Sequence, residues 1–230
     1  MIDVRVVDDP AAEVADVLLD VGCAGGHIAL AGGSTPRRAY GLVAGRDADL
    51  SAATMWLGDE RIVPPDHEWS NERMVRESLL AAMPEDRRPA LVRVETELGV
   101  DGAAAAYEDR LREKLGHHPR LDLALLGLGP DAHTASLFPG MPALQEHHRL
   151  AVGVPDAGMD PRVPRVTLTF LVLNTAREVV FLVSGADKAE AVVRAFADPA
   201  DPAAPAAHVR PGAGTLTVIL DPAAARGLQT

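Results

Sequence analysis

Asp131 and His133 lie two residues apart in a glycine-rich stretch, LGLGPDAHTASLFPG, that follows an apolar run and spans residues 126–140. A histidine in such a loop titrates near neutral pH, as a general base should, and glycines let a backbone approach a ligand closely. The carboxylate of Asp131 could fix the imidazole tautomer or help to position water. We therefore expect an active-site loop here, with an ordinary hydrogen-bonded loop histidine as the alternative.

A second glycine pair follows another strand-like run, in the order Gly32, Gly33, Ser34, Thr35, Pro36. The glycines allow close backbone approach, Ser34 or Thr35 can cap the next helix, and Pro36 fits its first turn. Free N–H groups and the positive helix end would then face an anion. The sequence predicts a phosphate cradle, and an ordinary capped turn is the alternative.

Further charged residues stand at predicted element ends. Asp59, Glu60 and Arg61 follow a strand-like run and could supply a base, a structural partner and a cation for a developing oxyanion, unless they form a solvated cluster. Arg165 precedes an apolar run, and Lys188 falls in the first turn of a helical pattern, where a cation opposes the helix dipole. We expect both to bind an anion, with solubility and stem packing as the alternative.

Strand-like and helical patterns alternate along the chain, which indicates βαβ units. The strand-like runs are Ile2–Val7, His27–Ala31, Thr54–Leu57, Leu91–Val94, Leu121–Leu128, Leu150–Val154, Glu178–Ser184 and Thr215–Leu220. The helical patterns are Pro10–Val21, Pro36–Val43, Ser70–Met83, Asp101–Leu115 and Asp187–Phe196, and the proline-rich stretch 199–205 is a surface connection. We expect an α/β fold, Rossmann-like and doubly wound, in which a mostly parallel sheet carries helices on both faces and residues 1–230 form a single domain.

The composition and net charge of the chain exclude several classes of function. The chain is 47% hydrophobic with a net charge of −11, so it can bury a full core and its field argues against a nucleic-acid partner. No apolar run is long enough to span a membrane and no signal segment is apparent, so we expect a cytoplasmic protein. The single Cys23 excludes internal disulfides and is predicted to be a small packing residue. The pairs His117–His118 and His147–His148 lack metal-ligand spacing, so we expect solvated side chains and no metal.

Six motifs together resemble a known family. They are Ala31–Pro36, Gly58–Arg61, Ser70–Asn71, Gly127–Gly140, Pro164–Thr167 and Gly185–Lys188. In this order they are similar to the 6-phosphogluconolactonase branch of the glucosamine-6-phosphate isomerase/6-phosphogluconolactonase superfamily, and they span nearly the whole chain. One departure is Ala132, because the family usually has glycine between the aspartate and the histidine. We expect either an ordinary φ at Ala132 or a shifted loop.

The resemblance implies hydrolysis of 6-phospho-D-glucono-1,5-lactone in the oxidative pentose phosphate pathway. His133 would activate water, while Arg165, Lys188 and the loop of Gly33, Ser34 and Thr35 would hold the phosphate. In this scheme Arg61 steadies the oxyanion, and Asp59 and Asp131 have supporting catalytic roles. We expect a monomer or weak homo-oligomer whose partner is the small sugar-phosphate lactone, with no metal or organic cofactor.

Two other functions stay open. A glucosamine-6-phosphate deaminase of the sister branch would share the phosphate site and an aspartate like Asp59, but that branch carries a glutamate where this loop has Leu137-Phe138-Pro139. A non-catalytic sugar-phosphate sensor is the other alternative. A serine hydrolase is disfavoured because G-x-S-x-G is absent.

Overall fold

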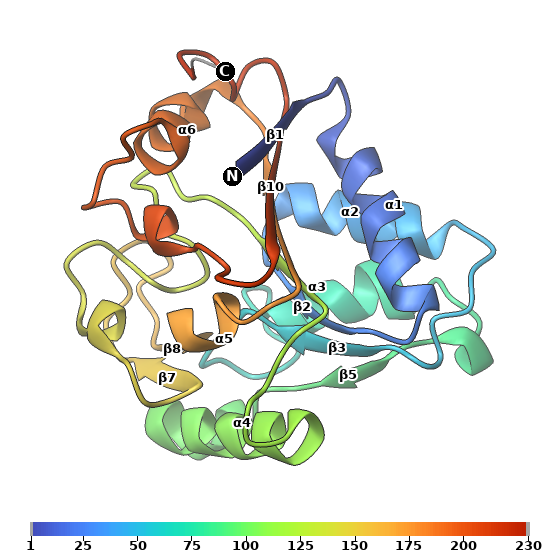
Figure 1. Ribbon diagram of the computed structural model, residues 1–230. Helices are drawn as coiled ribbons and strands as arrows, with labels where there is room; N and C mark the ends of the chain where they lie inside the picture. The colour runs from blue at the N-terminus through green and yellow to red at the C-terminus, as the bar shows by residue number, and fades with distance from the viewer. Residues whose placement is uncertain (1, 229–230) are drawn as a thin grey trace.

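A seven-stranded parallel sheet lies at the centre of the computed structural model, which describes residues 2–228 (Figure 1). Its strand order is β1-β10-β9-β6-β2-β3-β5. The strands are β1 Ile2–Val6, β2 His27–Leu30, β3 Thr54–Leu57, β5 Ala90–Val92, β6 Leu123–Leu126, β9 Glu178–Val183 and β10 Thr215–Leu220. The predicted doubly wound, parallel α/β architecture is confirmed.

Helices cover both faces of this sheet. In Figure 1, α1 (Pro10–Cys23) and α2 (Ser34–Ala44) lie on one side of β10 and α6 (Ala189–Phe196) lies on the other. Asp9 starts α1, because its side chain accepts a hydrogen bond from the Ala12 backbone N–H and proline occupies the first turn. The central strands are buried on both faces, all four residues of β6 for example, which explains their continuous aliphatic sequence.

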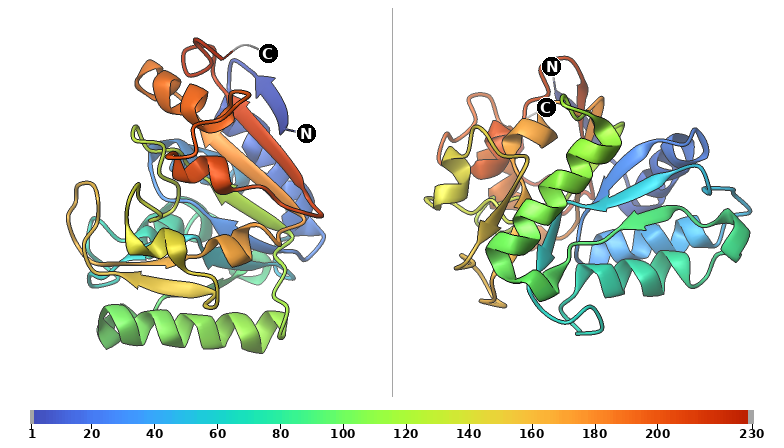
Figure 2. Two further views of the ribbon diagram at one scale, coloured as in Figure 1. Left: turned by 60° about the vertical axis from the view of Figure 1, so that its left-hand side comes forward. Right: turned by 90° about the horizontal axis from the view of Figure 1, so that it is seen from below.

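A second, three-stranded antiparallel sheet was not predicted. It has the order β4-β8-β7, formed by β4 Asp59–Arg61, β8 Arg165–Leu168 and β7 Ala151–Val154. The run Leu150–Val154 therefore belongs to this sheet and not to the parallel one. The helix α4 (Gly99–Leu115) packs against β7, as Figure 2 shows. Strand β4 consists of three charged residues, so no apolar pattern marks it, and it pairs with β8 about a hundred residues further along the chain.

Several helix predictions need correction. The pattern Ser70–Met83 is α3 (Asn71–Val75) followed directly by a π-helical turn at Arg76–Leu80. A 3₁₀ turn at Ala186–Lys188 precedes α6, and the short helix α5 (Phe170–Leu173) had no recognisable pattern. Cys23 is exposed at the end of α1, so its prediction as a packing residue was wrong. Within residues 2–228, no helix is both long and apolar enough to cross a membrane.

The strand order reverses direction between β2 and β6. From β2 the chain adds β3 and then β5 on one side, whereas β6, β9 and β10 follow one another on the other side. Loops that leave the carboxyl ends of β2 and β6 therefore diverge and open a crevice, which is where doubly wound sheets bind ligands. Both glycine-rich motifs of the sequence follow these two strands.

Candidate active site

A cavity of about 220 Å³ occupies this crevice. Loops after β2, β3, β6 and β9 contribute to it, together with β4, β8 and the loop before β8. Among the residues that line it are Gly32, Gly33, Asp59, Arg61, His133, Arg165 and Lys188, all of them candidates from the sequence. The structure thus brings together side chains from segments more than 150 residues apart.

His133 is fixed by the carboxylate behind it. Its Nδ1 lies 2.5 Å from Oδ1 of Asp131, and its backbone N–H donates to the same oxygen at 3.1 Å. Burial opposes ionisation of Asp131, but the hydrogen bonds from His133 hold the pKa of that carboxyl below its ordinary value. This hydrogen-bond pattern assigns the imidazole proton to Nδ1 and leaves the Nε2 lone pair free. Asp131 itself does not line the cavity, so its contact with the imidazole is made at Nδ1, outside the cavity lining.

Two neighbours set the plane of the imidazole. A Cβ atom at Gly129 would lie 2.0 Å from His133 Nδ1, so only glycine leaves room for the ring. On the other side, the Phe138 ring lies 4.5 Å from the imidazole centroid at an angle of 41°. The histidine is therefore held between the backbone of its own loop and a buried aromatic ring.

Ala132 adopts φ = +66°, and Ala135 in the same loop has φ = +48°. The alanine that departs from the family pattern thus occupies the left-handed region itself, so the first of the two expected alternatives, an ordinary φ at Ala132, was wrong. Such a conformation costs an alanine on the order of 1 kcal/mol relative to glycine. Ala132 is fully buried, and its carbonyl accepts a hydrogen bond from the Ala206 N–H, which holds the strained turn in place.

Asp59 is buried at the start of β4 and accepts hydrogen bonds from two other segments. Ser136 Oγ donates to Asp59 Oδ2 at 2.6 Å, and Asn71 Nδ2 donates to Oδ1 at 3.1 Å. Arg165 Nη1 lies 3.4 Å from Ser136 Oγ and 3.9 Å from Asp59 Oδ2. The Asp59 carboxylate therefore positions Ser136, Asn71 and Arg165.

The three cations of the cavity are Arg61, Arg165 and Lys188. Arg165 is only 3% exposed, and burial lowers its pKa although Asp59 opposes that shift. The Nε atoms of Arg61 and Arg165 are buried and have no hydrogen-bond partner among the described residues. A buried N–H left without an acceptor is costly, so these two atoms fit a site that an anionic ligand completes.

Glu60 organises the segment that carries Arg61. Its carboxylate accepts hydrogen bonds from the backbone N–H groups of Arg61, Asn71 and Glu72 and from the Ser70 hydroxyl. Burial raises the pKa of Glu60, and the backbone hydrogen bonds oppose that shift. A carboxylate thus sits at the N-terminus of α3, where the helix dipole favours it.

The loop after β2 brings backbone, not side chains, to the cavity. Gly33 has φ = +109° and precedes α2, and no side chain caps that helix, so the expected capping by Ser34 or Thr35 was wrong. Ser34 and Thr35 follow in the first turn of α2 and do not line the cavity. Gly32 lies against the Asn71 amide, where a Cβ would approach Oδ1 to 2.3 Å.

Three residues of the site were not assigned a role from the sequence. Ser136 and Phe138 lie inside the recognised loop motif, so their position was visible but their partners in β4 and β8 were not. Met159 lines the cavity from the loop before β8, and its carbonyl accepts a hydrogen bond from Arg165 Nη2. Nothing in the local sequence marks Met159. Among residues 2–228 no group of three or more metal-ligating side chains is arranged to hold a metal ion.

Fold and site define a doubly wound α/β protein with a histidine and a cluster of cations at its topological switch point. The family model described as "Glucosamine-6-phosphate isomerases/6-phosphogluconolactonase" matches residues 5–218, so the chain belongs to this family. It is 40% identical to 6-phosphogluconolactonase from Nostoc sp. (86% of this chain, 82% of the relative) and 41% identical to that from Synechocystis sp. (89% and 85%).

The fold agrees with solved structures of the same branch. The structure of 6-phosphogluconolactonase from Trypanosoma cruzi superposes with a TM-score of 0.88 at 31% identity, covering 100% of this chain and 98% of that one. The resemblance drawn from the ordered motifs, and with it the expected class of enzyme, are confirmed.

Proposed function

We propose that the chain hydrolyses 6-phospho-D-glucono-1,5-lactone to 6-phosphogluconate, and that His133 activates the attacking water. One observation carries the proposal: a histidine with a free Nε2 and three cations line the same cavity. The names of the relatives support the same substrate. A neutral lactone would not call for this many cations, whereas a phosphate dianion does.

The phosphate fits the cationic end of the cavity. Arg165 and Lys188 supply charge, and the backbone of Gly33 leads into the N-terminus of α2, whose first N–H groups attract anions. The side chain of Lys188 is 23% exposed and contacts Asp187 at 3.6 Å, a contact that leaves its other N–H groups free for a phosphate. In this arrangement the lactone ring extends toward His133.

The chemical step is general-base hydrolysis of an activated ester. His133 Nε2 accepts a proton from water as the water oxygen bonds to the lactone carbonyl carbon. The tetrahedral oxyanion is steadied by Arg61, whose Nε has no other partner within residues 2–228. The bond to the ring oxygen then breaks, that oxygen takes the proton from the imidazolium, and the carboxylic acid ionises. Asp131 stabilises the imidazolium between the two proton transfers.

Replacing His133 by alanine tests the general base. We expect His133→Ala to lower kcat by about 10²–10⁴-fold, because proton transfer in the transition state is lost, while KM changes little. The measurement is hydrolysis of freshly prepared phosphorylated lactone above its spontaneous background. A variant with unaltered kcat would remove His133 from the mechanism. Release of ammonia from glucosamine 6-phosphate by the wild type would favour the deaminase instead.

The phosphate site is tested with the two lysines of the chain. Lys188→Ala removes one charge-assisted hydrogen bond, so KM for the phosphorylated lactone should rise roughly 10–100-fold. Hydrolysis of unphosphorylated gluconolactone should stay as slow as in the wild type. Lys114→Ala, on the exposed surface of α4, is the matched control and should leave KM unchanged. Equal KM values for both variants would place the phosphate elsewhere.

A further inference from the structure

Among the cavities outside the site described above, two share lining residues with each other and none with that site. They have volumes of about 730 Å³ and about 600 Å³, which fall in the range of ~300–1,000 Å³ typical of small-molecule sites. Both are lined by Leu171, Asn174 and Thr175, at the end of α5. The adjacent His147 and His148 are divided between them, so the two cavities are neighbours.

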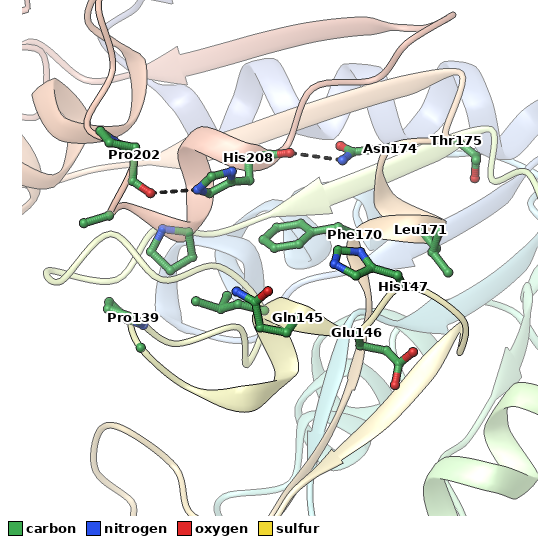
Figure 3. Close-up of a pocket in the computed structure, with 14 residues that line it drawn as sticks. Pro139, Gln145, Glu146, His147, Phe170, Leu171, Asn174, Thr175, Pro202 and His208 are labelled. Carbon is green, nitrogen blue, oxygen red and sulfur yellow. Dashed lines mark hydrogen bonds between the residues drawn. The ribbon is translucent and has the colours of Figure 1, made fainter.

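The larger cavity has an aromatic and apolar wall. The rings of Phe170 and His208 lie 5.9 Å apart, and Leu144 and three prolines (139, 202 and 205) extend this apolar surface. Glu146 is the one acidic residue of the lining. Hydrogen bonds fix this wall, because His208 Nε2 bonds to the Pro202 carbonyl and Asn174 Nδ2 donates to the His208 carbonyl (Figure 3). Figure 3 also shows the Gln145 amide facing the same space. A flat heterocycle that stacks on rings and hydrogen-bonds at its edge suits this surface.

The smaller cavity is cationic. It is lined by Arg112, Arg120 and three histidines (117, 118 and 148) and by no acidic residue, in a chain whose net charge is −11. Arg112 is paired with Glu108 at 2.6 Å, but Arg120 has no carboxylate within 4 Å among the described residues. Instead, Arg120 Nε and Nη2 donate to the carbonyls of Thr175 and Ala213, and these hydrogen bonds hold the guanidinium in place. Because carbonyl groups are neutral, they do not neutralise the positive charge of Arg120. A fixed guanidinium beside imidazole N–H groups suits phosphate oxygens.

We propose that the two cavities form one site for a nucleoside polyphosphate. The base would stack on Phe170 and His208, and the phosphates would contact Arg120 and the neighbouring histidines. This pairing is favoured because an aromatic surface and a cationic surface adjoin across a single short helix. The site is also near the catalytic loop, since Pro139 in its wall follows Phe138, the ring that packs on His133.

Calorimetric titration of the full chain with ADP tests this proposal, with adenosine and inorganic pyrophosphate as probes of the two halves. ADP should bind at least about tenfold more tightly than either probe, because the linked halves bind as one ligand. Arg120→Gln should weaken ADP and pyrophosphate about tenfold and leave adenosine unchanged. Phe170→Leu, or Gln145→Ala if the first variant is unstable, should weaken ADP and adenosine only.

Two further variants test whether ADP binding is specific to this site. Arg46→Gln, an exposed arginine after α2, is the matched control and should bind ADP like the wild type. Lys188→Ala should also bind ADP normally while its lactonase KM rises, so a failure here is distinct from a failure of the proposed catalytic function. The proposal is overturned if ADP binds no better than pyrophosphate, if Arg120→Gln binds ADP normally, or if Lys188→Ala abolishes ADP binding.

Discussion

At the scale of single residues, the orientation of His133 depends on what surrounds the imidazole as much as on its hydrogen bond. Asp131 fixes Nδ1, but the ring would not reach its position if the loop carried a side chain at residue 129. Phe138 closes the opposite side and also lies 5.3 Å from the Arg165 guanidinium. One buried ring therefore aligns the proposed base and one of the proposed phosphate ligands.

Gly129→Ala tests this steric requirement. The added Cβ would overlap His133 Nδ1 and Cε1, so the ring must move away from Asp131. We expect kcat to fall by about 10²-fold or more, because a misplaced base loses most of its contribution, while KM for the phosphorylated lactone changes little. Gly41→Ala, where a Cβ meets nothing within 4 Å, is the control. Wild-type kcat in Gly129→Ala would show that the imidazole position is not critical.

At the scale of elements, the N-terminus of α3 is held by the carboxylate of Glu60, a residue of β4. Glu60→Gln keeps the shape of the side chain but turns an NH₂ group toward the Ser70 hydroxyl and backbone N–H donors. Leaving buried donors unpaired should lower the free energy of unfolding by ~1–3 kcal/mol, measured by urea denaturation. Glu113→Gln, at an exposed ion pair, should change it by less than about 0.5 kcal/mol. Equal stabilities of the two variants would contradict this role of Glu60.

The same elements show which parts of the fold could be predicted from sequence. The parallel strands and α1, α2 and α4 were predicted because buried aliphatic runs and helix signals are local. The sheet β4-β8-β7 was missed because its pairing, Asp59 with Thr167 and Arg61 with Arg165, is set by contacts between distant segments. For that reason the sequence indicated Arg61 and Arg165 as separate cations but not as cross-strand neighbours.

The sequence predicted the charged side chains of the candidate site, but it predicted fewer of the residues that position them. His133, Arg165 and Lys188 meet in one cavity, as expected from their positions at strand and helix ends. Ser34 was expected to hold the phosphate, whereas Gly32 and Gly33, the two residues before it, line the cavity. Met159 could not be identified, because only the packing of its loop on Arg165 brings it to the cavity.

At the scale of the whole molecule, the cavity depends on the two sheets being held together. The loop after β6 belongs to the parallel sheet, while Asp59 and Arg165 belong to the antiparallel one. Ser136 joins them through its hydroxyl, and its backbone N–H donates to Thr167 Oγ1 at 3.1 Å. Since distant charges are screened beyond roughly 8 Å at physiological salt, a phosphate in the cavity responds to these local cations more than to the net charge of −11.

Ser136→Ala tests whether this junction controls catalysis. The variant leaves Asp59 Oδ2 buried without its closest donor and loosens Arg165, so kcat/KM should fall roughly tenfold and the free energy of unfolding by ~1–3 kcal/mol. That loss corresponds to a Tm lower by about 2–4 °C per kcal/mol for a chain of this size. Ser78→Ala, which removes a hydroxyl bonded to a helix carbonyl, is the control for the loss of a hydrogen bond alone. A drop in stability with unchanged kcat/KM would mean that Ser136 supports the fold but does not position Arg165. If Ser136→Ala lowers both stability and kcat/KM and Ser78→Ala does not, the junction of the two sheets contributes to catalysis.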